Sequence, residues 1–208
     1  MIKNPFNYSN LALLLASKQN VFSLGDLSLI WGESNRILVS DLAGWYVDSG
    51  KFFKIKTGLF SLLDPLTQKN LNYQLSIAQK LVSPSYISYH TVLAESGVNF
   101  QYYNSIHSCG LINKKFKVAD QDFIYHKIEA EIFYNPLGII KNQFGLDQAC
   151  IERAICDSWY INSGLGLDNI ENINLELLLE LAIIYNKSRI WKNLKSVFGI
   201  KKPQYAQP

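Results

Sequence analysis

One stretch, residues 22 to 62, constrains the fold more than any other part of the chain: FSLGDLSLIWGESNRILVSDLAGWYVDSGKFFKIKTGLFSL. Ser23 is a good N-cap, and Asp26 follows at the position where an acid favours the positive end of a helix. Gly32 predicts the end of that helix, and Ser34 predicts the cap of a second one. Because the break between the two helices is so short, they must cross rather than continue.

The second helix is expected from about residue 35 to residue 49, with two different faces. The core side is predicted to carry Leu38, Leu42 and Trp45, which recur at positions i, i+4 and i+7. The outer side is predicted to carry Arg36, Ser40, Ala43 and Val47. Asp41 and Asp48 are expected off the centre of this outer side, so the face is small, free of acid and suited to lie close to a duplex.

A two-stranded ribbon is predicted next, because Gly50 stops the helix and the segments KFFKIK and LFSLL flank a Thr57-Gly58 turn. Lys51, Lys54 and Lys56 decorate this ribbon and are placed to meet phosphates beside a groove. Taken alone, three lysines on a hairpin are better explained as a solvated face.

Helix, turn, helix and ribbon in this order predict a winged helix-turn-helix that binds DNA. In such a head the second helix enters the major groove with its N-terminal residues leading, where Arg reads guanine and Asn reads adenine. The candidate DNA-binding residues are Ser34, Asn35, Arg36, Ser40, Lys51, Lys54, Lys56 and Thr57.

The number of cations limits the affinity. Four basic side chains neutralise about four phosphates, which supports salt-sensitive binding in the range of roughly 0.1 mM to 1 µM. We therefore expect that function needs two copies on paired half-sites, or further cations from elsewhere in the chain.

The fold class expected is α+β: a winged head over residues 1–63, then a mixed α/β domain over residues 64–208 that ends in helices. The length of 208 residues suits two small domains, and Asp64-Pro65 is a natural break. A first helix is predicted over residues 4–17, with Leu11, Leu14 and Leu15 as its packing stripe.

After the break, the pattern predicts helices over residues 66–82 and 84–97, three strands between residues 102 and 128, a helix over residues 146–161 and a long last helix interrupted near Asn186. With 48% hydrophobic and 18% charged residues the chain can bury a proper core. We expect no signal peptide and no membrane span. Three cysteines without framework spacing favour a reducing, cytoplasmic setting.

Two segments carry a family resemblance. The segment KLVSPSYISYHTVLAESGV, followed later by IERAICD at residues 151–157, resembles AbiE-type (abortive infection) antitoxins, transcriptional regulators of viral defence. The family has an "EKAL-D" marker, which Glu152, Ala154 and Asp157 match and from which Arg153 and Ile155 depart. The resemblance covers roughly residues 20–162.

The resemblance implies a repressor that binds inverted repeats in the promoter of its own operon, with two copies cooperating on double-stranded DNA. It also implies that residues 64–208 counter a cognate nucleotidyltransferase toxin, without a stable complex between the two proteins. An alternative is an interaction module that keeps the winged fold without DNA binding, since Arg36 is the one cation of the outer helix face.

An enzyme that acts on nucleic acid is the least favoured hypothesis. His90, His107 and His126 are far apart in the chain and have no Cys or carboxylate at ligand spacing, so we expect no metal site and no cofactor. Each ring is expected at the surface or half-buried. Glu129 and Glu131 would alternate faces on a strand and are poor candidates for a paired acid and base.

The stretch over residues 186–202 holds six basic side chains and no acid. It is compatible with a nucleic-acid contact, a membrane-surface patch or a docking surface for an acidic partner. A solvated C-terminal helix whose cations suit its own dipole is an equally good explanation.

Overall fold

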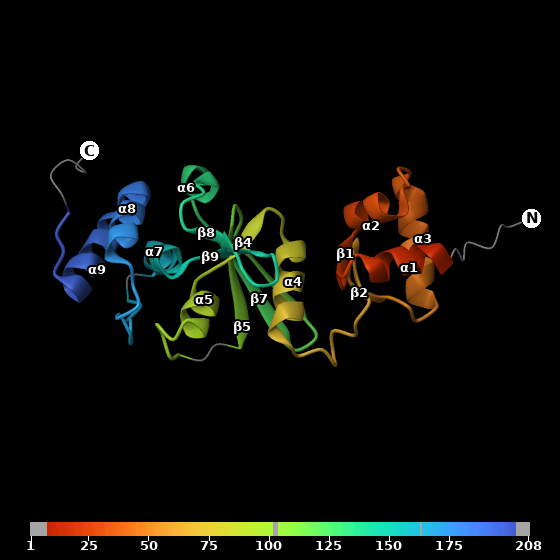
Figure 1. The fold of residues 1–208 in the computed structure, drawn as a ribbon, viewed down its shortest axis with the longest axis horizontal. Coiled ribbons are helices and arrows are strands. Elements are labelled where there is room, and N and C mark those ends of the chain that lie inside the picture. The colour runs from red at the N-terminus through yellow and green to blue at the C-terminus, as the bar shows by residue number, and fades with distance from the viewer. Residues whose placement is uncertain (1–7, 102–103, 163, 203–208) are drawn as a thin grey trace, which may run out of the picture. The chain divides into compact units, whose positions relative to one another are not determined.

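The computed structural model describes residues 8–101, 104–162 and 164–202, which fold as two compact units (Figure 1). The first unit ends at Leu81 and also includes Val118–Asp120, and the second comprises Val82–Lys117 and the chain from Gln121 onward. Helices and two sheets make up the fold, so the α+β class is confirmed.

The first unit alternates helices with short strands. In chain order its elements are α1 (Tyr8–Ala16), β1 (Val21–Ser23), α2 (Leu24–Trp31), α3 (Arg36–Asp48), β2 (Phe53–Lys56), β3 (Leu59–Ser61) and α4 (Leu71–Leu81). The three strands form an antiparallel sheet in the order β1-β3-β2, with Phe22 opposite Phe60 and Phe53 opposite Ser61. β1 was not expected from the sequence, where its three residues are too few to show a period.

An aromatic cluster forms the core of this unit. The Tyr46 ring stacks on Phe52 at a centroid distance of 5.0 Å, and Trp31 and Phe60 pack against the same ring of Phe52. In α1, Leu14 is fully buried as predicted, but Leu15 is 64% exposed and does not belong to the packing stripe. Residues 4–7 of the predicted first helix lie outside the described residues.

Helix α4 belongs with the first unit because its Tyr73 is bonded to the end of the sheet. The Tyr73 hydroxyl lies 2.8 Å from the Ser61 hydroxyl and donates to the Leu63 carbonyl at 3.0 Å. The passage between units therefore falls after Leu81, whereas the expected boundary lies between residues 63 and 64. α4 also begins at Leu71, later than predicted.

The second unit is built on a six-stranded mixed sheet. Its strands are β4 (Ser85–Ile87), β5 (Ser105–Gly110), β6 (Lys114–Val118), β7 (Gln121–Lys127), β8 (Ile139–Lys141) and β9 (Asp147–Ala149), in the order β6-β7-β5-β4-β9-β8. Its helices are α5 (His90–Glu95), α6 (Ala130–Tyr134), α7 (Ile151–Ile161), α8 (Leu175–Tyr185) and α9 (Ser188–Phe198). β4 runs parallel to β9, and β5 runs parallel to β7.

Helix α7 lies between the sheet and the helices α8 and α9 (Figure 1). It buries charged as well as apolar side chains, since Arg153, Asp157 and Trp159 are each fully buried. The predicted interruption near Asn186 is confirmed, because Asn186 takes a left-handed conformation between α8 and α9. The helix expected from residue 84 is wrong in its first half, where residues 85–87 form β4.

Candidate functional site

Capping residues fix both ends of helix α2. Ser23 caps α2 in a capping box: its hydroxyl accepts from the Asp26 amide at 3.2 Å, and Asp26 accepts from the Ser23 amide at 2.7 Å. Gly32 ends α2 in the left-handed conformation, with φ of 66°. Both predictions from the sequence are confirmed.

Asn35, and not Ser34, caps helix α3. The Asn35 side-chain oxygen accepts from the amides of Ile37 at 3.0 Å and Leu38 at 3.4 Å. This use of the oxygen removes the acceptor that a bidentate contact with adenine would need. Ser34, Arg36 and Ser40 are exposed around this end of the helix, where a ligand can reach them.

The centre of the buried face of α3 is rotated by one residue from the prediction, although Leu42 and Trp45 pack against the core as predicted. Val39, Ala43 and Tyr46 face the core and are at most 1% exposed, whereas Leu38 is 53% exposed. Ala43 was predicted outside and is buried, and Val47 packs against the core. The aromatic cluster decides the phase, because Tyr46 fills the space between Trp31 and Phe52.

The outer face of α3 is acidic and apolar rather than small and neutral. At 100° per residue, Asp41 and Asp48 lie opposite the buried stripe, and both are exposed. Ile37, on the same side, is 72% exposed. Beside it, a hollow of about 370 Å³ is lined by Leu38, Asp41, Leu42 and Trp45. The expectation of an outer face without acid is therefore wrong.

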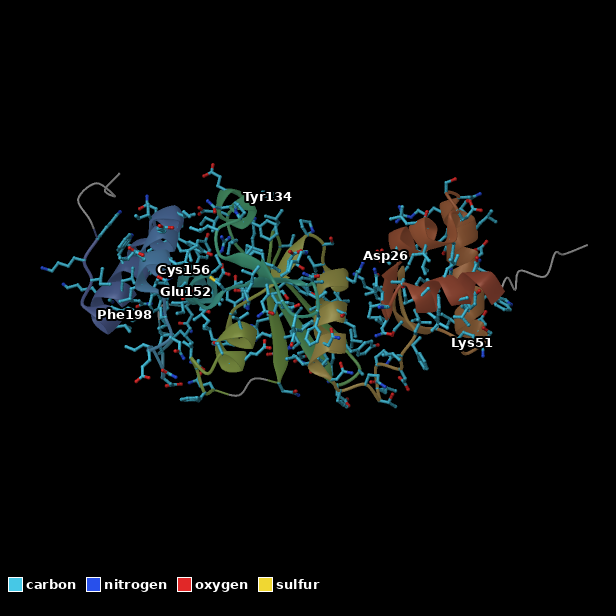
Figure 2. All side chains as sticks on the ribbon, viewed as in Figure 1. Asp26, Lys51, Tyr134, Glu152, Cys156 and Phe198 are labelled. Atoms are coloured by element: carbon cyan, nitrogen blue, oxygen red, sulfur yellow. The ribbon has the colours of Figure 1, made fainter. Side chains whose placement is uncertain are left out.

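The side chains predicted to bind DNA from the ribbon differ in their exposure to solvent. Lys51, Lys54 and Thr57 are exposed, and Lys51 is labelled in Figure 2. Lys56 is half-buried, and its ammonium donates to the Leu81 carbonyl at 2.7 Å, at the end of α4. This bond commits Lys56 to the interior of the first unit, so it is a poor phosphate contact.

In the second unit, Arg153 is the centre of a buried polar network that the sequence did not predict. Its guanidinium donates to the carbonyls of Ile132 and Leu137, both at 2.7 Å, and of Asn135 at 3.0 Å. It also donates to the Tyr86 hydroxyl at 3.3 Å. One fully buried cation thus holds together β4, α7 and the end of α6.

Asp157, one helical turn after Arg153, completes this network. It accepts from Ser88 at 2.6 Å, from Tyr86 at 3.2 Å and from Tyr185. Complete burial raises the pKa of Asp157, and the nearby Arg153 charge and the three hydroxyl donors oppose that rise. Asp157 is fully buried and each of its donors comes from within the unit, so the group is structural in character.

Three histidines that are remote in the chain meet in the second unit. Parallel pairing of β5 with β7 brings His107 Nδ1 within 3.0 Å of His126 Nε2, and the two rings stack at 5.2 Å. The His90 ring lies 5.3 Å from that of His107. The expectation of three separate rings is therefore wrong. His90 and His126 are half-buried, as expected, but His107 is only 7% exposed.

Burial governs the acid–base behaviour of this cluster. Burial, with a smaller contribution from the neighbouring rings, lowers the pKa of His107 to about 3 and that of His126 to about 4. Such rings are neutral at pH 7. Over the described part of the chain, no group of three or more His, Cys, Asp and Glu side chains is arranged to hold a metal ion.

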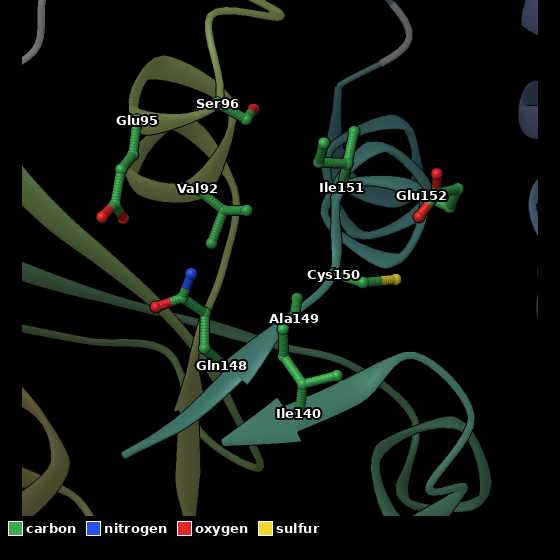
Figure 3. A pocket seen from close by; sticks show the side chains of 9 residues that line it. All are labelled: Val92, Glu95, Ser96, Ile140, Gln148, Ala149, Cys150, Ile151 and Glu152. Carbon is green, nitrogen blue, oxygen red and sulfur yellow. The ribbon is translucent and has the colours of Figure 1, made fainter. Parts of the chain in front are cut away.

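A hollow of about 320 Å³ lies between α5 and α7, above the strands β8 and β9 (Figure 3). Its walls include Val92, Ile140, Gln148, Ala149, Cys150 and Ile151. Burial raises the pKa of Cys150 to about 11, and its sulfur accepts from the Arg153 amide at 3.4 Å, so it is a thiol that caps α7. Glu152 accepts from the Asn174 amide at 2.8 Å. Cys150 and Glu152 thus each accept a hydrogen bond from a backbone amide and hold that segment in place.

No protein-family model matches the chain, and a search of curated proteins finds no relative. Among the described residues, every helix is too short or too polar to cross a bilayer.

Proposed function

We propose that the chain is a DNA-binding transcriptional regulator whose first unit is a winged helix-turn-helix. The observation that carries the proposal is the order α1-β1-α2-α3-β2-β3, with β3 between β1 and β2 in the sheet. In this arrangement two helices cross at a short turn and a hairpin follows the second one. A helix-turn-helix presents its second helix to the major groove and the hairpin to the flanking backbone.

The proposed contacts are the exposed members of the predicted set other than Asn35, whose side-chain oxygen caps α3. They are Ser34, Arg36 and Ser40 at the start of α3, and Lys51, Lys54 and Thr57 on the ribbon. Since Asp41 and Asp48 repel phosphates along the rest of α3, the duplex meets this helix at its N-terminal end. Three cations neutralise about three phosphates, which favours two copies on inverted repeats over one copy alone.

The resemblance to AbiE-type antitoxins extends the proposal to the second unit. On that basis the protein represses its own promoter, and the second unit counters a nucleotidyltransferase toxin. The two segments that carry the resemblance are bonded to each other: Ser88 in the first segment donates to Asp157 in the second at 2.6 Å. A shared structural role for Ser88 and Asp157 supports a common fold for both segments. Three free thiols support the proposed cytoplasmic setting.

Fluorescence anisotropy tests the DNA-binding proposal. The full chain is titrated against the DNA upstream of its own gene and against a scrambled duplex of equal length, at several salt concentrations. We expect a preference of about a hundredfold for the native duplex. Arg36→Glu with Lys54→Glu removes it, whereas Lys114→Glu, an exposed lysine of the second unit, leaves it unchanged. Equal, weak and steeply salt-dependent binding to both duplexes refutes sequence-specific regulation.

A protein-interaction module is the second candidate, favoured by the hollow at Leu38, Asp41, Leu42 and Trp45. An apolar hollow with an acid at its rim suits an apolar side chain flanked by a cation of a partner protein. The two candidates respond differently to Arg36→Glu with Lys54→Glu. A DNA-binding regulator loses its binding, whereas an interaction module keeps its activity.

A further inference from the structure

Helix α9 presents a cationic outer face. It buries Ile190, Trp191 and Leu194 in the second unit, and its other side exposes Arg189, Lys192 and Lys195 at successive i, i+3 positions. Such positions lie on one side of a helix, about 4.5 Å apart along its axis. Phe198, labelled in Figure 2, ends the helix, and Lys201 is exposed just after it.

The cations of this stretch are concentrated rather than diffuse. Residues 186–202 contain six Lys and Arg and no acid, whereas residues 82–185 contain six Lys and Arg and twelve Asp and Glu. Lys187 pairs with Glu129 at 2.6 Å, and Arg189 donates to the Tyr160 carbonyl at 2.6 Å. Within the described part of the chain, Lys192, Lys195 and Lys201 form no ion pair. Their charges are therefore directed at solvent.

The residues of the outer face of α9 indicate which class of partner it binds. A bilayer would require the apolar side of α9 to be free, but Ile190, Trp191 and Leu194 are buried in the unit's own core. A protein interface would require an apolar anchor among the cations, and the neighbours on this side are Ser188 and Ser196. Spaced cations without an anchor suit the phosphates of a nucleic-acid backbone.

We propose that the outer face of α9 is a second phosphate-contact surface, and that Lys192, Lys195 and Lys201 hold DNA backbone there. The inference rests on the proposed DNA-binding function. It supplies cations beyond Arg36, Lys51 and Lys54, which are too few for tight binding. Because the contact is to phosphates, it adds affinity without adding sequence preference.

The salt dependence of DNA binding tests the inference in the full chain. Each phosphate contact contributes about −0.9 to the slope of log K against log salt concentration for duplex DNA. Replacing Lys192, Lys195 and Lys201 together by Gln is expected to make that slope shallower by about 2 to 3 and to weaken both native and scrambled duplexes alike. The control replaces Lys114, Lys115 and Lys141 by Gln, which removes the same charge from β6 and β8, the two edge strands of the sheet.

The outcomes separate the two proposals. If the wild-type chain binds no duplex even at low salt, both proposals are overturned. If the wild type prefers its own promoter and the α9 variant keeps the wild-type slope, the regulator stands and the α9 inference is refuted. An equal change of slope in the control variant also refutes it, since net charge alone would then explain the effect. If the α9 variant loses binding to vesicles of phosphatidylserine and phosphatidylcholine but keeps the wild-type slope for DNA, the α9 face is assigned to a membrane instead.

Discussion

Lys80 on α4 contacts both carboxylate oxygens of Asp26, each at 2.8 Å. Asp26 is also the residue that closes the capping box of α2 (labelled in Figure 2). Burial alone would raise the pKa of Asp26, but the hydrogen bonds from Lys80 and Ser23 outweigh it and lower the pKa below its ordinary value. A local capping signal and a distant lysine therefore stabilise the same helix end.

Asp26→Ala is expected to lower the free energy of unfolding by about 1 to 2 kcal/mol. The loss combines a helix cap, about 1 kcal/mol, with a partly exposed ion pair worth at most about 1 kcal/mol. Because the folded pKa is lowered, this contribution is present above the unfolded pKa and disappears as the pH falls through the folded value. Urea denaturation measures it. Asp48→Ala, an exposed acid at the end of α3, is the control, and an equal loss there would contradict the assignment.

Removing the acids of α3 should reveal whether DNA lies along the whole helix or only at its start. If the duplex meets the N-terminal end alone, as proposed, Asp41→Asn and Asp48→Asn each improve affinity by less than about threefold, because exposed charges at a distance are screened by salt. Anisotropy against the promoter duplex measures the change. A gain of tenfold or more would show that the outer face of α3 lies in the groove.

Arg153→Met is expected to cost about 3 to 5 kcal/mol, because it removes the cation beside the buried Asp157 and leaves the Asn135 and Leu137 carbonyls without the guanidinium donor. Thermal and urea denaturation of the full chain measure the loss. Lys192→Met removes an exposed cation from the same unit and is expected to change stability by less than about 0.5 kcal/mol. A loss below about 1 kcal/mol at Arg153 would show that the network is not structural.

Local signals in the sequence predicted the start of the fold well, and long-range contacts explain where it was mispredicted. Ser23, Asp26 and Gly32 act within one helix, so their roles could be predicted from spacing. The phase of α3 could not, because Leu38, Leu42 and Trp45 are as apolar as Val39, Ala43 and Tyr46. The packing of Tyr46 against Phe52 settled the choice.

In the second unit, even more of the structure depends on long-range contacts that could not be predicted from the sequence. Ser88, Arg153 and Asp157 carry the family resemblance or border on it, but no spacing rule links Ser88, just after β4, to a helix more than sixty residues later. His107 and His126 meet only because β5 pairs in parallel with β7, although β6 lies between these two strands in the sequence. Likewise, the sequence predicted Lys56 as a phosphate contact. In the structure its ammonium donates instead to the Leu81 carbonyl at the end of α4.

The histidine cluster predicts that stability falls in mild acid. The pKa values of His107 and His126 are lowered to about 3 and about 4 in the folded chain, whereas an unfolded His titrates near 6.5. Below pH 6.5 the unfolded chain therefore binds more protons than the folded chain, and the free energy of unfolding decreases as the pH falls.

Between pH 7.5 and pH 5 the decrease should be about 1 to 2 kcal/mol for each ring, since one pH unit is worth up to about 1.4 kcal/mol per proton. Urea denaturation at the two pH values gives the difference. His126→Gln keeps a polar side chain at this position but removes one titrating ring, so its decrease should be smaller than that of the wild type by the contribution of one ring, while His107 and His90 still contribute. If His126→Gln loses as much stability as the wild type between the two pH values, the histidine cluster is not the source of the decrease.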